Sequence, residues 1–259
     1  MIIPKKVKSM NNWKIYNILN QQNELIAGST TKDIAFDYDF SLALHTGEDR
    51  DKILKNRDKF VQNFDKEFKF VSQYQVHSNK IINIDKYDIN QKWKEFQLNA
   101  DGFVTSKPNI MLNILTADCI ALLAYDKKAK IIGAAHAGWK GTKDNISKNL
   151  IENMESLGAK KEDIVVAISP SIRGCCYEVG ESVAKHFTQY PNSLVKTPKN
   201  KWHLDISVVN REQLVELGIL DKNIEVSPIC TACKNKDYFS YRKECGCSGR
   251  FVSFIGMRD

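Results

Sequence analysis

Two short aliphatic runs separated by a polar turn are the feature that most restricts how this chain can fold. Residues 120–125 and 131–135 are of strand length, and the segment between them, 126–130, is mostly lysine and aspartate. Apolar runs of this length on either side of a short polar turn predict an antiparallel β-hairpin.

The hairpin has a chemical consequence, because a cysteine precedes its first strand and a histidine ends its second. If the turn closes at Lys127 and Lys128, Cys119 lies directly opposite His136. Opposed residues of an antiparallel pair have Cα atoms about 4.5–5.5 Å apart. A thiolate and an imidazole at that separation can share one metal ion or one proton.

A third candidate for this site is His77. It follows the short alternating segment 73–76 and precedes the apolar run 81–84, so we expect it near a strand end, where functional side chains often collect. The other three histidines lack comparable surroundings; they are His45, His186 and His203. One residue beyond His136, the sequence Gly-Trp-Lys-Gly adds a turn, an aromatic ring and a cation.

The rest of the chain mixes α and β elements without a regular βαβ alternation. Helical periodicity predicts helices over 143–157, capped by Thr142 and ended by Gly158, and over 206–217, between Asp205 and Gly218. Aliphatic runs predict further strands at 110–115 and 164–168, whereas 190–201 is predicted to be a surface loop. No repeat or linker interrupts residues 1–259, so we expect one domain.

Composition excludes several classes of protein. With 259 residues, 42% hydrophobic and 27% charged, the chain is neither disordered, collagenous nor a coiled coil. Its apolar runs are far shorter than the roughly 18 residues of a membrane span, so we expect no membrane partner. The first residues carry lysines without a following apolar run, which indicates no secretory signal and a cytoplasmic protein.

The net charge of +7 favours anionic ligands, but the lysines are scattered among acidic residues. We therefore expect no nucleic-acid partner.

Seven cysteines in a reducing compartment are expected to be buried, metal-bound or reactive, not paired in disulfides. One group could supply four thiolates to a structural zinc ion, although its second pair departs from the common Cys-x-x-Cys spacing. Its members are Cys230, Cys233, Cys245 and Cys247. A redox pair of Cys230 and Cys233 is the alternative. The adjacent Cys175 and Cys176 are expected in a buried turn, since neighbouring residues seldom bind one metal together.

Many short motifs in order along nearly the whole chain resemble one bacterial family. They are Gly28-Ser-Thr-Thr31, Asn56-Arg57, Gln75-Val-His77, Ala100-Asp-Gly102, Thr116-Ala-Asp-Cys119, His136-Ala-Gly-Trp139, Ser169-Pro-Ser-Ile172, Cys176-Tyr-Glu-Val179, Trp202-His-Leu-Asp205, Cys230-Thr231, Phe239-Ser-Tyr-Arg242 and Gly249-Arg250. The family is the laccase-domain or polyphenol oxidase family, also called the purine nucleoside phosphorylase or peptidoglycan editing factor family. The resemblance implies an α+β fold of mixed β-sheets packed with outer helices, in a single domain of the laccase-domain (cytotoxic necrotizing factor-like) type.

The resemblance also implies a site and an activity. The positions that match the family's ligands, His77, Cys119 and His136, would bind one zinc ion with a fourth position open, as in catalytic zinc sites. The implied reactions are phosphorolysis of adenosine, inosine and methylthioadenosine, and deamination of adenosine, so purine nucleosides and phosphate are the expected partners. The cations expected to contact phosphate and substrate are Arg57, Lys140, Arg242 and Arg250.

Three positions depart from the family pattern without removing a metal ligand. They are Ser78 and Ser169, where glycine is usual, and Lys243, where a second arginine often follows Arg242. Lysine lacks the bidentate fork of arginine, so we expect these departures to affect affinity and substrate preference.

Two other readings of the sequence stay open. In the first, Cys119 is a nucleophile and His136 its base in a metal-free hydrolase, to which removal of a wrong amino acid from a peptidoglycan precursor is chemically closest. In the second, residues 230–247 form a non-catalytic metal-binding or nucleic-acid-binding module. Cu²⁺ could replace Zn²⁺ in the His₂Cys set, but one such set is not a multi-copper array, so polyphenol oxidation is expected only as a side activity.

Overall fold

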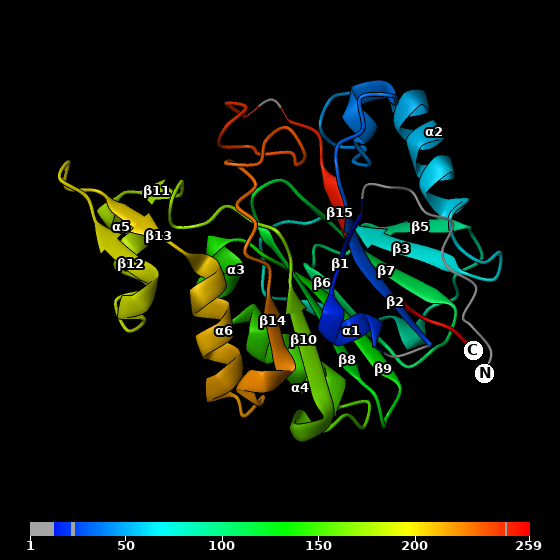
Figure 1. Cartoon of the computed structure of the whole chain (residues 1–259). Coiled ribbons are helices and arrows are strands. Elements are labelled where there is room, and N and C mark those ends of the chain that lie inside the picture. Colours follow the sequence, from blue (N-terminus) through cyan, green and yellow to red (C-terminus); the bar gives the residue numbers. More distant parts are fainter. Residues whose placement is uncertain (1–12, 22–23, 247) are drawn as a thin grey trace.

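The computed structural model describes residues 13–21, 24–246 and 248–259, and within them two mixed six-stranded sheets face each other (Figure 1). The first sheet has the order β1 (Trp13–Ile15), β2 (Leu25–Thr30), β15 (Phe251–Met257), β7 (Ile110–Thr116), β3 (Lys69–Gln73), β5 (Trp93–Phe96). The second has the order β14 (Ile224–Val226), β10 (Ile164–Ile168), β8 (Ile120–Asp126), β9 (Ile131–Ala137), β6 (Gly102–Thr105), β4 (Ile81–Asn83). A small third sheet, at the left of Figure 1, has the order β11 (Glu178–Val179), β13 (Trp202–Leu204), β12 (Leu194–Lys196).

The core between the two large sheets is built from alternate residues of their strands. Leu112 and Ile114 of β7 meet Leu123 and Tyr125 of β8, and all four side chains are fully buried. Alternation directs successive side chains to opposite faces, so each sheet has a second apolar face to cover.

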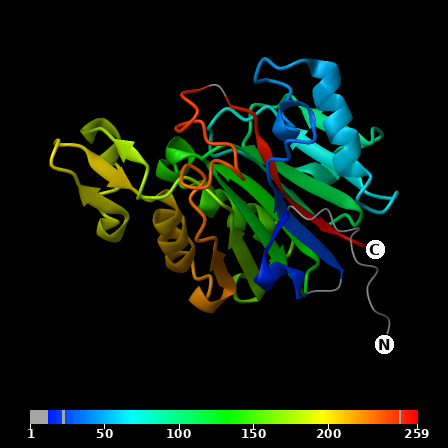
Figure 2. The same cartoon turned by 45° about the horizontal axis from the view of Figure 1, so that its top comes forward.

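Helices cover these outer faces, so the molecule has four layers. The helix α2 (Arg50–Val61) packs on the first sheet through Phe60. The helices α4 (Ile146–Glu155) and α6 (Ile206–Glu216) pack on the second sheet. Figure 2 shows α2 and α6 on opposite sides of the sheets. The shorter helices are α1 (Asn17–Asn20), α3 (Trp139–Lys143) and α5 (Glu181–Ala184), and the 3₁₀ turns are Asp37–Phe40, Ile84–Lys86, Lys161–Asp163, Pro191–Ser193 and Asp221–Asn223.

The predicted strands are confirmed, but the predicted hairpin register is wrong by two residues. Ala121, not Cys119, pairs with His136. The reason is a longer turn, in which the Asp126 carboxylate accepts the backbone N–H groups of Lys128 and Ala129 at 2.8 and 2.9 Å. A shift of two residues keeps the same face of a strand, so the thiol still approaches the imidazole.

The helix predicted over 143–157 forms as α4 but begins at Ile146, because the separate short helix α3 ends at Lys143. Asn145 separates α3 from α4 in the left-handed conformation (φ 56°), and its side chain accepts the N–H of Lys148. The predicted cap, Thr142, therefore lies inside α3. The helix ends two residues before the predicted end, at Glu155, and the left-handed Gly158 (φ +108°) closes the turn that follows it.

The helix predicted over 206–217 forms as α6, capped by Asp205. The prediction of a loop over 190–201 is wrong in part, because β12 lies within it. This strand pairs with β13 at the edge of the small sheet, and its Val195 is 65% accessible. Because its side chains are exposed, the strand lacks the alternation of apolar and polar residues by which a sequence predicts a strand.

The connections between the two large sheets position the site. Three of them run from a strand of the first sheet to a strand of the second: 74–80 between β3 and β4, 97–101 between β5 and β6, and 117–119 between β7 and β8. We call these the three crossovers. They bring polar side chains to one rim of the sheet pair.

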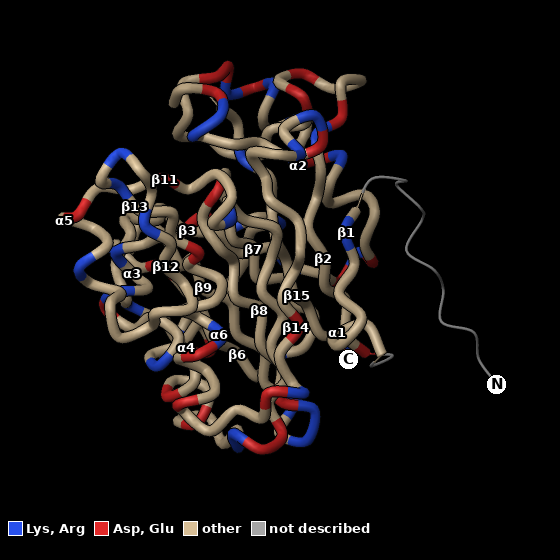
Figure 3. The backbone as a smooth tube through the Cα atoms, turned by 60° about the vertical axis from the view of Figure 1, so that its left-hand side comes forward, with Lys and Arg blue, Asp and Glu red and all other residues tan. Residues whose placement is uncertain are grey.

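Charges of both signs are interspersed along the connections in the view of Figure 3, while the central strands are mostly uncharged. Among the described residues, no helix is both long and apolar enough to pass through a membrane.

Candidate metal centre and active site

The structure brings together the three side chains predicted to bind a metal. His77 lies on the first crossover, Cys119 on the third, and His136 in β9. Their ligand atoms all lie within 4.8 Å of one another, and the Cys119 Sγ is 3.9 Å from the His77 Nε2. The two imidazole centroids are 4.8 Å apart, with the rings nearly perpendicular at 76°. This convergence fits a single metal ion that holds two nitrogens and one sulfur.

A buried carboxylate behind the three residues orients both histidines. Asp101, on the second crossover, accepts the Nδ1–H of His136 at 2.8 Å and the backbone N–H of His77 at 3.0 Å. It also accepts N–H groups from Val76 and Ser78 and the hydroxyl of Ser78. These bonds hold His77 in a left-handed conformation (φ 60°). With its Nδ1 occupied, His136 has its Nε2 free for a metal or a proton.

A glycine leaves the room that the ligands need. A Cβ atom on Gly138 would lie 2.8 Å from the His77 Cδ2 and 3.1 Å from the Cys119 Sγ. Both distances are shorter than ordinary van der Waals contacts between such atoms. The glycine of the His-Ala-Gly-Trp motif is therefore needed because His77 and Cys119 approach its backbone closely. It is not needed for its backbone conformation, since a φ of −78° is open to any residue.

Burial and charge act in opposite directions on the thiol and the imidazole. Burial by itself raises the pKa of Cys119, but the charge of His136 and hydrogen bonds from His136 and His77 outweigh it and lower that pKa to about 6. Burial lowers the pKa of His136, but the Cys119 thiolate and Asp101 outweigh it and raise that pKa to about 9. The two pKa shifts favour a thiolate beside an imidazolium, and the thiolate is the form that binds metals and attacks carbonyls.

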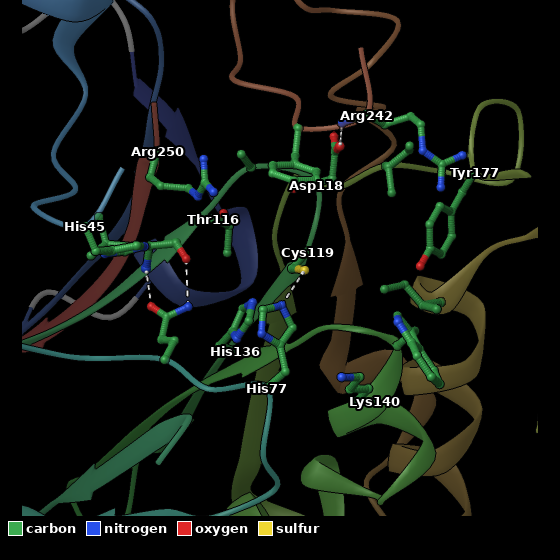
Figure 4. A pocket seen from close by; sticks show the side chains of 17 residues that line it. His45, His77, Thr116, Asp118, Cys119, His136, Lys140, Tyr177, Arg242 and Arg250 are labelled. Atoms are coloured by element: carbon green, nitrogen blue, oxygen red, sulfur yellow. Dashed lines mark hydrogen bonds between the residues drawn. The ribbon is translucent and has the colours of Figure 1, made fainter. Parts of the chain in front are cut away.

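A cavity of about 550 Å³ opens over these residues. Its volume is within the range of roughly 300–1,000 Å³ typical of small-molecule sites. His45 and Arg250 lie on one side of the three ligands, and Lys140, Tyr177 and Arg242 on the other (Figure 4). The cavity thus has the three potential metal ligands on its floor and cations on both walls.

Three of the four predicted substrate cations line the cavity: Lys140, Arg242 and Arg250. Within the described part of the chain, none of the three forms an ion pair with a carboxylate. The Arg242 guanidinium donates to the carbonyl of Glu178 at 2.8 Å and lies 5.2 Å from the ring of Tyr177. Their charge is therefore available to an anion.

The structure does not bring Arg57 into this cavity. Its guanidinium is buried, pairs with Glu95 at 3.0 Å, donates to the carbonyl of Leu42 at 2.8 Å and lies over the ring of Trp93. These contacts fix α2 to the first sheet, which is a structural role.

Sequence reasoning missed three residues of the site. His45 lines the cavity, and burial together with Arg250 lowers its pKa. Gln75 bonds both the N–H and the carbonyl of Leu115, at 2.9 and 2.8 Å, and so joins the first crossover to β7. His45 lies in an irregular segment where periodicity gives no signal, whereas Gln75 belongs to the Gln75-Val-His77 motif but its contact with Leu115 is distant in sequence. Asp101 stood in a recognised motif, but its role depends on contacts distant in sequence.

The expected cysteine group differs from the observed one. The sulfurs that gather are those of Cys175, Cys176, Cys230 and Cys233, and their Sγ atoms lie within 4.8 Å of one another. Cys245 is not in this group, and Cys247 lies outside the described residues. The turn expected at 175–176 is confirmed, but it is not buried, since Cys175 is exposed and Cys176 half-buried.

A set of two histidines and one cysteine beside an open cavity could hold a metal ion with one position left to water or substrate, the arrangement of catalytic metal sites, whereas a structural site closes its fourth position with protein. A family model described as "Multi-copper polyphenol oxidoreductase laccase" matches residues 28–258, and the chain belongs to this laccase-domain family.

Relatives with named activities match most of the chain. Purine nucleoside phosphorylase YlmD of Bacillus subtilis (strain 168) is 34% identical over 254 residues, covering 93% of this chain and 91% of that protein. Adenosine deaminase RL5, from an unknown prokaryotic organism, is 34% identical over 192 residues, covering 71% and 72%.

A solved structure confirms the fold. The crystal structure of the Bacillus licheniformis hypothetical protein YfiH superposes with a TM-score of 0.86 at 28% identity, covering 99% of this chain and 100% of that one. The α+β fold of mixed sheets and outer helices, expected from the sequence, is thereby confirmed.

Proposed function

We propose that this protein is a zinc-dependent purine nucleoside phosphorylase that acts on adenosine, inosine and methylthioadenosine and also deaminates adenosine. The observation that carries the proposal is the convergence of His77, Cys119 and His136 on the floor of a nucleoside-sized cavity with free cations on its walls. The names of the purine nucleoside phosphorylase and adenosine deaminase relatives support it.

The cations account for phosphorolysis. In that reaction a phosphate oxygen forms a bond to C1′ of the ribose while the bond from C1′ to the purine nitrogen breaks, and the base leaves with the bonding electrons. Lys140, Arg242 and Arg250 hold the anionic nucleophile and offset the negative charge that develops on the leaving base. Arg57 has no part in this proposal, since Glu95 already neutralises it.

The donor set fits zinc. Two imidazole nitrogens and one thiolate suit Zn²⁺, and Cu²⁺ as a replacement ion. When bound, zinc supplies a Lewis acid with an open position and lowers the pKa of a bound water toward 7, which deamination requires. Asp101 would keep the Nε2 of His136 directed at the ion as one of its three protein ligands, and Cys119 would provide one negative charge. A reducing cytoplasm keeps the Cys119 thiol available, so we place the protein there.

The test is a phosphate-dependent assay of the three nucleosides with metal analysis on the same preparation. We expect free base and sugar phosphate only when phosphate is present, and ammonia from adenosine. Cys119→Ser should lose one metal ion per chain and both activities while keeping its circular dichroism spectrum. Cys245→Ser is the matched control, because Cys245 is exposed and outside both metal-ligand groups. A folded Cys119→Ser protein with unchanged turnover contradicts the proposal.

One observation favours a second candidate, a thiol hydrolase. The site contains a potential catalytic triad. Cys119 would be the nucleophile, His136 its base and Asp101 the carboxylate that orients the base, and the lowered pKa of Cys119 favours the thiolate. Hydrolysis of an amide, as in the editing of a peptidoglycan precursor, would use this triad without metal. Stringent chelation separates the two candidates. Nucleoside cleavage that disappears on chelation and returns with zinc supports the first, and amide hydrolysis that survives chelation supports the second.

A further inference from the structure

Four cysteines meet on the side of the second sheet where β10 and β14 end. These strands are parallel neighbours, with Val166 opposite Ile224, so the segments that follow them leave the sheet at the same edge. Cys175 and Cys176 lie on the segment after β10, and Cys230 and Cys233 on the segment after β14.

Backbone pairing continues from the two strands to the cysteines. Ser171 and Cys230 form a parallel bridge, and the N–H of Thr231 donates to the carbonyl of Ser171 at 3.0 Å. The backbone N–H groups of Arg173 and Cys233 also bond to the Cys230 thiol. The two segments are therefore positioned by the fold and not by chance contact of exposed side chains.

The sulfur spacing is that of a tetrahedral metal site. The Cys233 Sγ lies 3.4 Å from that of Cys176 and 3.7 Å from that of Cys175, and the four sulfurs all lie within 4.8 Å of one another. Four sulfurs at about 2.3 Å from one zinc ion, at the corners of a tetrahedron, are about 3.8 Å apart. Disulfide sulfurs, in contrast, are about 2.05 Å apart.

We propose that Cys175, Cys176, Cys230 and Cys233 bind a second metal ion, a structural zinc, separate from the centre that contains Cys119. Four thiolates complete the tetrahedron, so this ion has no open position and no part in chemistry. On binding, each thiol gives its proton to solvent, and the complete site carries a net charge of two minus. Three cations border the hollow beside it and offset this charge: Lys236, Arg242 and Lys243.

The ion would fasten one wall of the cavity. Cys176 precedes Tyr177, whose ring contacts Arg242. Thr231, next to Cys230, donates to the Asp118 carboxylate at 2.6 Å, and the backbone N–H of Arg242 donates to the same carboxylate at 2.7 Å. The four cysteines thus lie directly behind Tyr177, Asp118 and Arg242, all of which line the cavity.

Metal counting in the full-length protein tests the proposal without an activity assay. After growth with zinc and purification without chelator, we expect about two zinc ions per wild-type chain and about one in Cys119→Ser, Cys233→Ser or Cys176→Ser. Cys245→Ser should keep both. The Cys119→Ser protein loaded with Co²⁺ should show the strong thiolate-to-cobalt absorption of a four-sulfur site, and Cys119→Ser/Cys233→Ser should not.

Three outcomes would overturn the proposal. One is a Cys119→Ser protein that is folded, reduced and free of metal. Another is a Cys119→Ser protein whose cobalt spectrum lacks charge-transfer bands. The third is a wild-type protein, purified without chelator, that lacks the second zinc ion and contains a disulfide between Cys233 and Cys175 or Cys176, detected as the loss of two hydrogens by mass spectrometry. Because Cys119→Ser leaves the four cysteines intact, these outcomes are independent of the function proposed for the cavity.

Discussion

Asp101 joins the first crossover to His136 and so holds two of the three potential metal ligands in place. Its carboxylate accepts hydrogen bonds from three backbone N–H groups of the first crossover, from the Ser78 hydroxyl and from the His136 ring. Burial opposes its ionisation, but these bonds hold the pKa of Asp101 below its ordinary value. A single carboxylate thus sets the position of one histidine and the tautomer of the other.

Asp101→Asn should weaken metal binding at the cavity by about 10–100-fold, because an amide replaces one acceptor oxygen with donors and cannot hold all of these bonds. Competition with a chromophoric chelator measures this. Asp85→Asn is the matched control, since Asp85 accepts similar bonds from Thr105 and Ser106 away from the cavity. Equal affinities in wild type and Asp101→Asn would contradict the role assigned to Asp101.

The same carboxylate gives a pH dependence. A depressed folded-state pKa stabilises the native state above the group's ordinary pKa, and the contribution is lost as the pH falls through the folded-state value. Wild type should therefore lose stability on acidification in this range, and Asp101→Asn should lack that part of the loss. Urea unfolding of the metal-free proteins at a series of acidic pH values measures the difference.

Gly138→Ala should lower activity by about 100-fold, because its methyl group would displace His77 and Cys119 from metal-binding positions. The metal content should fall in parallel while the fold is retained. Gly180→Ala is the control, since the nearest atom to a Cβ there is 3.9 Å away. A Gly138→Ala protein with normal metal content and turnover would show that the ligands tolerate the methyl group.

At the scale of elements, the break between α3 and α4 matters most for the site. The short α3 places Gly138 beside the metal ligands and Lys140 in the cavity, while α4 covers the second sheet. A single straight helix over both segments could not place residues at the cavity and also cover the second sheet. Asn145 makes the change of direction, with a left-handed backbone and a side chain that caps α4.

Asn145→Ala should lower the free energy of unfolding by about 2 kcal/mol, since alanine loses the cap and is strained in the left-handed region. Asn145→Gly should cost less than half of that, because glycine accepts this conformation. Urea unfolding at equal metal loading compares the two variants. If both variants lost the same stability, backbone strain would have no share in the effect.

At the scale of the whole molecule, the site lies where the two sheets are connected. His77 and Cys119 lie on crossovers between the sheets, and His136 lies in a strand of the second sheet. A metal ion that binds all three therefore links segments far apart in the sequence, and it binds only when the sheets are packed. Metal binding and global stability are coupled for this reason.

Removing the ion of the cavity site should lower the melting temperature of the wild-type protein by about 5–10 °C, in addition to any loss from the four-cysteine site, taking about 2.7 kcal/mol for one ion present at about 100 times its Kd. Differential scanning fluorimetry with and without chelator measures this. In Cys119→Ser the drop should be smaller, because only the four-cysteine site remains to lose its ion. Equal drops in the two proteins would mean that the cavity centre does not stabilise the fold.

The local elements followed from the sequence alone, because hydrophobic periodicity and capping residues act over a few neighbouring positions. The strands predicted at 120–125 and 131–135, the helix that begins after Asp205 and the proximity of Cys119 to His136 were all predicted from it. The family resemblance supplied His77. Tertiary structure alone decided the register of the hairpin, the exclusion of Arg57 from the cavity and the gathering of Cys175 and Cys176 with Cys230 and Cys233. Each of these depends on which strands become neighbours, and that is determined by packing between segments tens of residues apart, which no local pattern records.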